Sequence, residues 1–231
     1  MIITIDGPTA SGKSTVGRIL AHKLGFYYVC SGLMYRAIAY VLINHCGCTL
    51  ETLNDISIEK FKQYIDSDRF TYTYNEESQE HIFFDNNDVT AYLKDTLIDR
   101  ATSIISINKN IRSKVTSMQR AIAANHNIVI DGRDVGSVVF PQAEIKFFIT
   151  ASLIVRASRW RKDQQKYNHF FSIEESTKFI TERDERDKNR IIAPLIVPKD
   201  AIILDTSSLN AEETVSLIMS HISNYQSNEI S

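Results

Sequence analysis

The chain has 231 residues, is 43% hydrophobic and carries a formal net charge of −2, with 26 lysines and arginines against 28 aspartates and glutamates. This length and composition are typical of one globular domain with a substantial core, and they exclude a small disulfide-stapled scaffold. The near-neutral charge argues against a protein that coats nucleic acids or membrane surfaces, because such binding requires a clear excess of lysine and arginine.

Cysteine usage and hydropathy bear on the location of the protein. Cys30, Cys46 and Cys48 are odd in number, and one residue separates the last two, which suits neither a disulfide framework nor a zinc site. The apolar run at residues 37–43 is far shorter than the ~20 residues that span a bilayer, and Lys13 interrupts the segment where a signal peptide would be apolar. We therefore expect a cytoplasmic protein, with no membrane and no nucleic-acid polymer among its partners.

Short apolar runs alternate along the chain with longer segments of helical periodicity. The runs predict buried strands at residues 2–5, 27–29, 128–130, 145–149 and 201–204. Among the segments between and after them, the last shows the helical spacing clearly, in Val215, Ile218, Met219 and Ile222. This alternation predicts an α/β fold, with a parallel sheet covered by helices on both faces.

One region departs from this alternation. Polar and aromatic residues alternate with period 2 over residues 69–74. Residues 81–84 form a second apolar run, and a turn-like segment follows it at 85–88. This pattern predicts a small antiparallel hairpin inserted into the α/β frame.

A glycine-rich segment follows the first predicted strand. It satisfies the pattern G-x-x-x-x-G-K followed by Ser or Thr, and it consists of Gly7, Pro8, Thr9, Ala10, Ser11, Gly12, Lys13, Ser14 and Thr15. The glycines allow backbone N–H groups to converge on phosphate oxygens at the N-terminus of the following helix. We expect Lys13 to reach the β- and γ-phosphates of a nucleotide and the Ser14 hydroxyl to hold Mg²⁺.

This phosphate-binding loop does not by itself specify a reaction. GTPase switches also read guanine through an Asn-Lys-x-Asp element, and the nearest string, from Asn108 to Ile111, lacks the final Asp. A nucleotide-dependent switch is therefore disfavoured, although it stays an alternative.

Polar groups also follow the second and third predicted strands. Ser31, Tyr35 and Arg36 come after the second, and Asp131, Arg133 and Asp134 after the third. Ligands of open α/β sheets bind at the carboxyl ends of the strands, so these side chains should face the same crevice as the phosphate-binding loop. Arg36 and Arg133 are then candidate phosphate ligands, and Asp131 stands where a carboxylate normally binds a water molecule of Mg²⁺.

Further charges lie in the second half of the chain. Arg183, Asp187 and Arg190 have the spacing i, i+4, i+7 and could share one helix face, although Arg186 competes for that face. Two other pairs, Ser103 with Arg112 and Arg156 with Arg159, would each be read as surface residues if taken alone.

The loop from Gly7 to Thr15, the string from Ser31 to Arg36, the string from Asp131 to Pro141 and the string from Glu182 to Leu195 resemble bacterial-type cytidylate kinase. The similarity extends from the first residues to about Asn210. It implies a P-loop kinase fold in a single domain over residues 1–231, with a mostly parallel five-stranded sheet and a small antiparallel sheet. It also implies a monophosphate-binding insertion at about residues 37–100 and a helical lid at about 153–169.

The resemblance further implies transfer of the ATP γ-phosphoryl group to CMP or dCMP in the presence of Mg²⁺. It matches Lys13 and the phosphate-binding loop to ATP, and Lys13, Arg133, Arg159 and Arg183 to catalytic positions. Its substrate positions are matched by Ser31, Tyr35, Arg36, Ser103, Arg112, Arg133, Asp134, Arg183, Asp187 and Arg190. Within that set Arg36, Arg133 and Arg183 correspond to arginines around the acceptor phosphate, and Ser103, Arg112 and Asp134 to positions that contact cytosine.

Three residues depart from the family pattern. Cys30 replaces a usual Asp, Lys94 a common Arg, and Trp160 the second arginine of the lid. We expect Cys30 to loosen the hydrogen bonding that orients Arg36, and Trp160 to remove one cation from the transition state. A kinase for another small acceptor is the alternative within enzymes, and a monomer is expected because the chain carries no association motif.

Overall fold

A parallel sheet forms the centre of the molecule. The computed structural model describes residues 1–54, 56–75, 77 and 79–229. In this part of the chain the sheet has five strands in the order β2-β6-β1-β7-β8, and every neighbouring pair is parallel. The strands are β1 (Ile2–Asp6), β2 (Tyr27–Cys30), β6 (Ile128–Gly132), β7 (Ile145–Thr150) and β8 (Ile202–Asp205). All five predicted strands are thus confirmed, each to within two residues.

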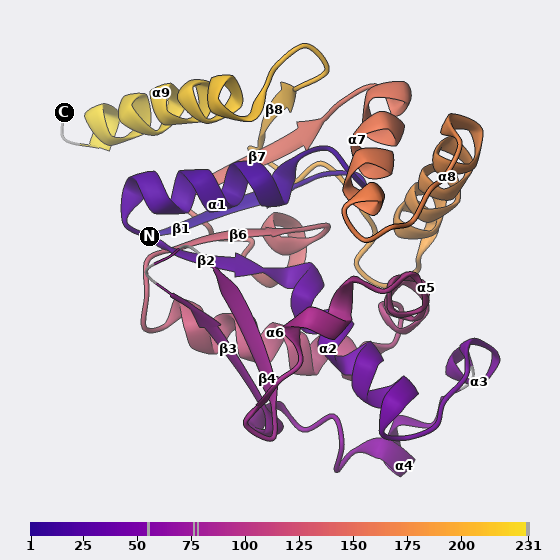
Figure 1. Ribbon diagram of the computed structural model, residues 1–231. Helices are drawn as coiled ribbons and strands as arrows, with labels where there is room; N and C mark the ends of the chain where they lie inside the picture. The colour runs from indigo at the N-terminus through magenta and orange to yellow at the C-terminus, as the bar shows by residue number, and fades with distance from the viewer. Residues whose placement is uncertain (55, 76, 78, 230–231) are drawn as a thin grey trace.

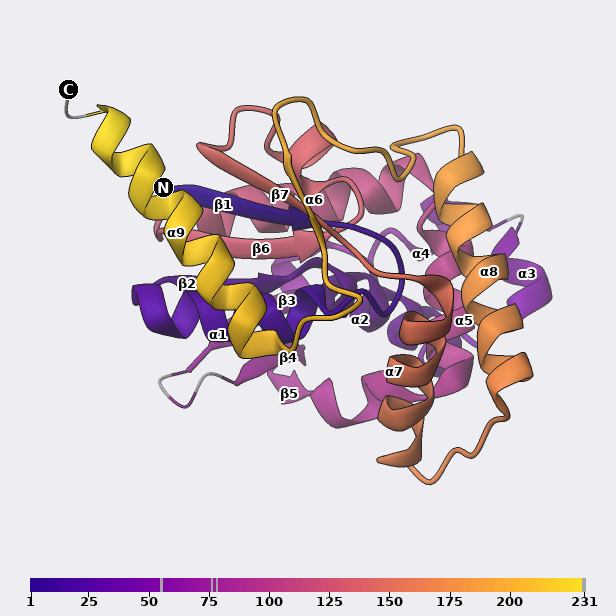
Figure 2. The ribbon, with the colours of Figure 1, turned by 90° about the horizontal axis from the view of Figure 1, so that it is seen from above.

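Helices cover both faces of this sheet, as predicted. On one face lie α1 (Lys13–Leu24) and α9 (Ala211–Glu229), which pack on each other (Figures 1 and 2). On the other lie α2 (Ser31–Asn44) and α6 (Lys109–Ala123), with α5 (Thr96–Ile105) packed against α2. Separate apolar clusters fill the two sides, one around Phe147 and Val215 and the other around Met34 and Ile130.

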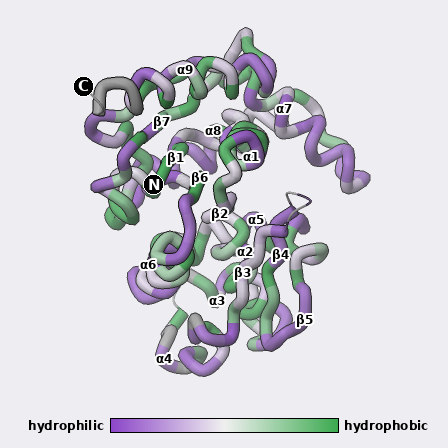
Figure 3. The backbone as a smooth tube through the Cα atoms, turned by 90° about the vertical axis from the view of Figure 1, so that its left-hand side faces the viewer, coloured by the Kyte–Doolittle hydropathy of each residue, from purple (hydrophilic) through white to green (hydrophobic). Residues whose placement is uncertain are grey.

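A second, antiparallel sheet lies in the segment between α2 and α5. It consists of β3 (Phe70–Tyr74), β4 (Glu80–Phe84) and β5 (Asn87–Asp88), in that order. The same segment contains the short helices α3 (Leu50–Asn54) and α4 (Ile58–Phe61) and the single turns η1 (Ser67–Arg69) and η2 (Thr90–Lys94). Its apolar side joins the Met34 cluster, and Figure 3 shows green, hydrophobic stretches in both sheets.

The predicted hairpin, β3 with β4, is confirmed, but the turn that follows β4 is shorter than the turn-like segment expected at 85–88. Asp85 and Asn86 complete the reversal alone with positive φ angles of 48° and 64°, a conformation that short polar side chains tolerate. Residues 87 and 88 are therefore free to pair with Phe84 and Phe83, which adds β5 as a third strand.

Two helices stand beside the carboxyl ends of the parallel strands. They are α7 (Leu153–Gln165) and α8 (Ile173–Asn189), which pack along each other next to the phosphate-binding loop (Figure 2). A capping box, in which Ser172 and Glu175 bond each other's backbone N–H groups, begins α8. A short helical turn, η3 (Val135–Val139), follows β6. None of the helices in the described residues is long and apolar enough to cross a membrane.

Candidate active site

The phosphate-binding loop connects β1 to α1, as the motif requires. Gly7 lies so close to β7 that an added Cβ would come within 2.0 Å of the Ile149 carbonyl oxygen, and its φ is +151°. Gly12, at φ +98°, turns the chain into α1. Both positions thus require glycine, and the loop delivers the N-terminus of a 12-residue helix, where N–H groups attract anions.

Lys13 begins α1 and folds back over the loop. Its ammonium donates to the Pro8 carbonyl at 2.6 Å and to the Ser11 hydroxyl at 3.3 Å. Burial, together with the nearby Arg133 cation, lowers the pKa of Lys13 well below its usual range. A bound phosphate would supply the missing negative charge, so this lysine is prepared for an anionic ligand.

Ser14 faces a carboxylate at the end of β6. Its hydroxyl donates to Asp131 Oδ2 at 2.7 Å, and the Tyr28 hydroxyl donates to Asp131 Oδ1 at 2.9 Å. No group of three or more His, Cys, Asp or Glu side chains that could hold a metal occurs in the described residues. The hydroxyl and carboxylate oxygens nevertheless suit Mg²⁺, which takes few protein ligands and completes its shell with water and phosphate.

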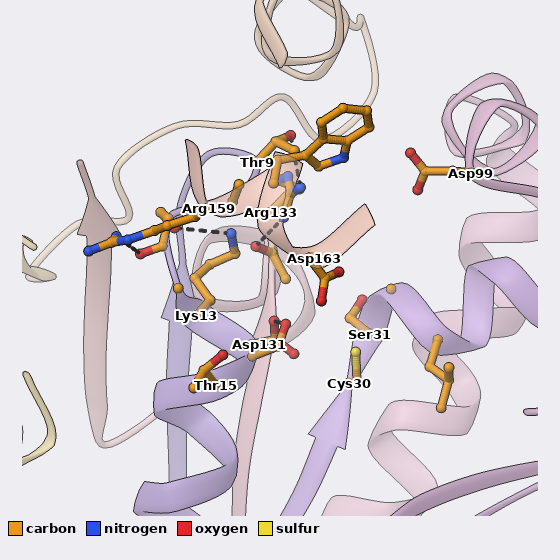
Figure 4. A pocket seen from close by; sticks show the side chains of 18 of the residues that line it. Thr9, Lys13, Thr15, Cys30, Ser31, Asp99, Asp131, Arg133, Arg159 and Asp163 are labelled. Atoms are coloured by element: carbon orange, nitrogen blue, oxygen red, sulfur yellow. Dashed lines mark hydrogen bonds between the residues drawn. The ribbon is translucent and has the colours of Figure 1, made fainter. Parts of the chain in front are cut away.

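A cavity of about 800 Å³ opens in front of the loop (Figure 4). Lys13, Arg133 and Arg159 lie on one side of it, and Cys30 and Ser31 lie across from Asp131 on the β2 side. All the sequence-predicted catalytic and substrate-binding residues line this cavity. Of the predicted loop residues, Thr9 to Thr15 line it as well, whereas Gly7 and Pro8 do not.

Asp134, one of the predicted base-contacting residues, is buried between two arginines. Oδ1 accepts from Arg190 at 3.1 Å, and Oδ2 accepts from Arg112. The Arg112 guanidinium also lies 5.6 Å from the centre of the Tyr35 ring. The nearby Ser103 hydroxyl is buried and has no hydrogen-bond partner among the described residues. An unpaired buried hydroxyl beside this charged group can serve a polar ligand.

Arg133 and Asp187 form a second ion pair in the cavity. Arg133 Nε donates to Asp187 at 2.8 Å, while its Nη2 donates to the Thr9 hydroxyl at 3.2 Å. Burial favours the neutral acid, but Arg133, Arg183 and Arg190 outweigh it and lower the pKa of Asp187. Arg133 therefore connects the end of β6 to both α8 and the phosphate-binding loop.

Arg36 and Arg183 meet at a third carboxylate, that of Asp99 on α5. Asp99 accepts from Arg36 Nη2 and from Arg183 Nη1, the latter at 2.8 and 2.6 Å to its two oxygens. Burial alone would raise the pKa of Asp99, but the two guanidinium groups lower it to about 2. Two of the three arginines predicted for the acceptor phosphate are thus adjacent in space.

Two arginines of α7 contact the phosphate-binding loop. Arg159 Nη1 donates to the Thr206 hydroxyl at 3.0 Å and to the Ser11 carbonyl at 3.3 Å, so it lies against the phosphate-binding loop. Arg156 is turned away from the cavity: it pairs with Asp184 and donates to the Thr9 carbonyl at 3.0 Å. Asp184 in turn accepts from the Thr9 N–H at 2.9 Å, so α7 and α8 both anchor the loop.

Comparisons with known proteins agree with this geometry. A family model described as cytidylate kinase matches residues 3–224. The chain belongs to the cytidylate kinase family. It is 36% identical to a cytidylate kinase of Halalkalibacterium halodurans, over 96% of this chain and 97% of that protein. It is 37% identical to that of Carboxydothermus hydrogenoformans, over 95% and 96%.

Solved structures support the fold. A shikimate kinase from Bacteroides thetaiotaomicron superposes with a TM-score of 0.51 at 14% identity, covering 96% of this chain and 98% of the other. This likeness concerns the fold alone, and it agrees with the P-loop kinase fold expected for this chain.

The three departures from the cytidylate kinase pattern have structural consequences. Burial raises the pKa of the Cys30 thiol to about 12, so this residue contributes no charge to the cavity. Arg36 is held by Asp99 and, at 3.0 Å, by the Leu93 carbonyl. Trp160 stacks on Phe179 with ring centres 4.5 Å apart and lines the cavity. Lys94 lies 5.7 Å from the ring centre of Tyr167.

Sequence reasoning missed two carboxylates of the site, Asp99 and Asp184. Asp184 lies in a highly charged stretch of α8, where an acidic residue normally faces water, and Asp99 is the one acidic residue of α5. Their partners are 63 and 84 residues away for Asp99, and 28 and 175 residues away for Asp184. No local spacing carries that information, so only the assembled cavity identifies them.

Proposed function

We propose that this protein transfers the γ-phosphoryl group of ATP to CMP or dCMP, forming ADP and CDP or dCDP. The observation that carries the proposal is the presence of two anion sites in one cavity. The phosphate-binding loop with Lys13 forms the donor side, and a group of paired arginines forms the acceptor side. Membership of the cytidylate kinase family supports the choice of donor and acceptor.

The acceptor side has the charge that a monophosphate needs. Three aspartates hold five arginines in this network, which leaves a formal charge of +2. The residues are Asp99, Asp134, Asp187, Arg36, Arg112, Arg133, Arg183 and Arg190. A dianionic phosphate would balance this charge, and each guanidinium can offer it paired N–H donors.

The chemistry requires positioning rather than a strong base. Phosphoryl transfer passes through a loose transition state, so the protein must align the acceptor oxygen with the γ-phosphate and neutralise the spreading charge. Lys13 and Arg133 reach the donor loop and the acceptor network, and we assign them to that task together with Arg159 and Arg183. The acceptor phosphate oxygen is itself the nucleophile.

Mg²⁺ fits beside the first turn of α1. Ser14 would hold it, with Asp131 accepting from a water molecule of its shell. When bound, the ion would neutralise charge on the β- and γ-phosphates.

Cytosine would be read by Asp134, Arg112 and Ser103. A carboxylate that accepts from the cytosine amino group faces an acceptor when uracil is bound instead, and such a mismatch costs on the order of 10²-fold in kcat/KM. Residues 37–100 would form the acceptor-binding insertion and residues 153–169 a lid that keeps water from the reacting groups. We propose that the enzyme acts as a monomer in the cytoplasm, where its cysteines, all free thiols, stay reduced.

One assay tests the proposal. Purified protein is given ATP and Mg²⁺ with CMP, dCMP, UMP or AMP, and ADP release is coupled to NADH oxidation. We expect CMP or dCMP to have the highest kcat/KM, and Lys13→Ala to lower that value by at least about 10²-fold. Preference for another acceptor would support a different small-molecule kinase, and ATP binding without any phosphorylated acceptor would support a switch.

A further inference from the structure

Asp99 is the point at which three elements of the acceptor side meet. It comes from α5, whereas Arg36 comes from α2 and Arg183 from α8. Oδ1 accepts from both arginines, and Oδ2 accepts from Arg183 alone. In Figure 4 the Asp99 carboxylate points toward the cavity from the side opposite Arg159. Asp99 therefore fixes the relative position of two helices as well as two cations.

The contacts leave the binding edges of both arginines available. Within the described residues, Arg183 makes its hydrogen bonds through Nη1, so the Nε and Nη2 edge remains for a phosphate. Arg36 uses Nη2 for Asp99 and Nη1 for the Leu93 carbonyl, which leaves Nε and one hydrogen on each terminal nitrogen. A carboxylate that merely occupied the phosphate position would be expected to bind the Nε and Nη2 edge of Arg183, which Asp99 leaves open.

The two guanidinium groups would not stay adjacent without a negative charge between them. The side chains of Arg36 and Arg183 are 22% and 14% exposed, so water screens their mutual repulsion only in part. The Asp99 side chain is itself only 11% exposed, so solvent has limited access to the position between the two cations. Arg133 also affects Asp99 electrostatically, but it pairs with Asp187.

We propose that Asp99 is a positioning residue for the acceptor: its carboxylate holds Arg36 and Arg183 side by side, with their free N–H groups directed at the monophosphate. The inference rests on the proposed function, because the acceptor phosphate belongs to that reaction. It differs from a competing arrangement in which Asp99 blocks the phosphate position and must be displaced.

Asp99→Asn tests this directly, because it keeps the side-chain volume and removes the charge. We expect the KM for CMP to rise about 10-fold, the gain typical of a hydrogen bond to a charged partner, with the KM for ATP changed less than twofold. Asp99→Glu, which restores the charge, should return the KM for CMP to within about threefold of the unaltered enzyme. Asp95→Asn is the matched control, since it removes an exposed charge from the N-cap of the same helix and keeps a capping side chain.

Binding of inorganic phosphate, measured by calorimetry without nucleotide, gives a second readout. We expect Asp99→Asn to weaken it about 10-fold and Asp95→Asn to leave it unchanged. Should Asp99→Asn not fold, as judged by thermal unfolding, Asp99→Thr takes its place with the same expectation.

The outcomes separate the two proposals. Tighter phosphate binding or a lower KM for CMP in Asp99→Asn would establish the blocking arrangement and overturn the inference, and so would no change. If the unaltered protein does not phosphorylate CMP, the proposed function fails, while weaker phosphate binding by Asp99→Asn would still support the positioning role.

Discussion

Ser14 and Asp131 lie 117 residues apart in the sequence, and a hydrogen bond of 2.7 Å joins their side chains. The contact links the first turn of α1 to the end of β6, because β1 and β6 are parallel neighbours whose carboxyl ends share one edge of the sheet. It leaves two oxygen atoms of the kind that Mg²⁺ prefers beside the predicted phosphate site.

Ser14→Ala should therefore raise the Mg²⁺ concentration required for half-maximal kinase activity, on the order of 10-fold, because one ligand is lost. Ser14→Thr, which keeps the hydroxyl and satisfies the same motif, is the matched control and should behave like the unaltered enzyme. Activity titrated against Mg²⁺ at saturating CMP and ATP measures the effect. Equal Mg²⁺ requirements for all three proteins would show that Ser14 is not a ligand.

Asp134→Ala should lower the preference for CMP over UMP. The loss of the carboxylate removes the group that favours an amino substituent, so the ratio of the two kcat/KM values should fall by about 10²-fold. Total activity should fall too, because Arg112 and Arg190 lose their shared partner. The ratio is the decisive measurement, since a general loss of structure would lower both values together; an unchanged ratio would exclude Asp134 from base recognition.

Ligand-induced closure of residues 153–169 should be visible by hydrogen exchange. A bisubstrate ligand is expected to slow exchange in this segment, because closure buries its backbone hydrogen bonds. Trp160 is the one tryptophan of the chain and lines the cavity, so its emission should change with the same ligand dependence. The part of α9 that follows Thr214 lines none of the cavity and serves as the internal control. Equal exchange rates with and without ligand would contradict a moving lid.

Asp6 should titrate near neutral pH. Burial raises its pKa to about 6, although the carboxylate accepts from the Val135 and Gly136 N–H groups at 2.9 and 2.7 Å. A folded-state pKa above the unfolded value means that the folded protein binds the proton more tightly, so stability falls as pH rises from about 4 to about 6. The expected loss is about 3 kcal/mol, on the order of two pKa units.

Denaturant unfolding between pH 4 and pH 7 measures this loss as a difference between the unaltered protein and Asp6→Asn, whose side chain does not titrate. Carbon-13 NMR of the Asp6 carboxyl gives the pKa directly. A transition below pH 4 would contradict the predicted environment.

Local patterns accounted for much of the fold. The strands were found because a strand buried on both faces must be a continuous apolar run, whatever surrounds it. The phosphate-binding loop was found because Gly7 and Gly12 satisfy steric conditions that no other residue meets in that turn. The turn after β4 was predicted too long, because the polar residues Asn87 and Asp88 are typical of a turn, whereas in the structure they pair with β4 as the strand β5.

The amino-acid sequence alone determined the α/β architecture, the glycine-rich loop that leads into α1 and, through four ordered motifs, the family. Those features depend on residues that are near one another along the chain, where spacing and steric limits act directly. Only the tertiary structure decided that Asp99 joins Arg36 to Arg183 and that Asp184 anchors the loop through Thr9. The stability of a buried charge depends on which distant partners the packed helices bring within a few ångströms of it. The periodicity of a sequence does not indicate how close such residues come in space.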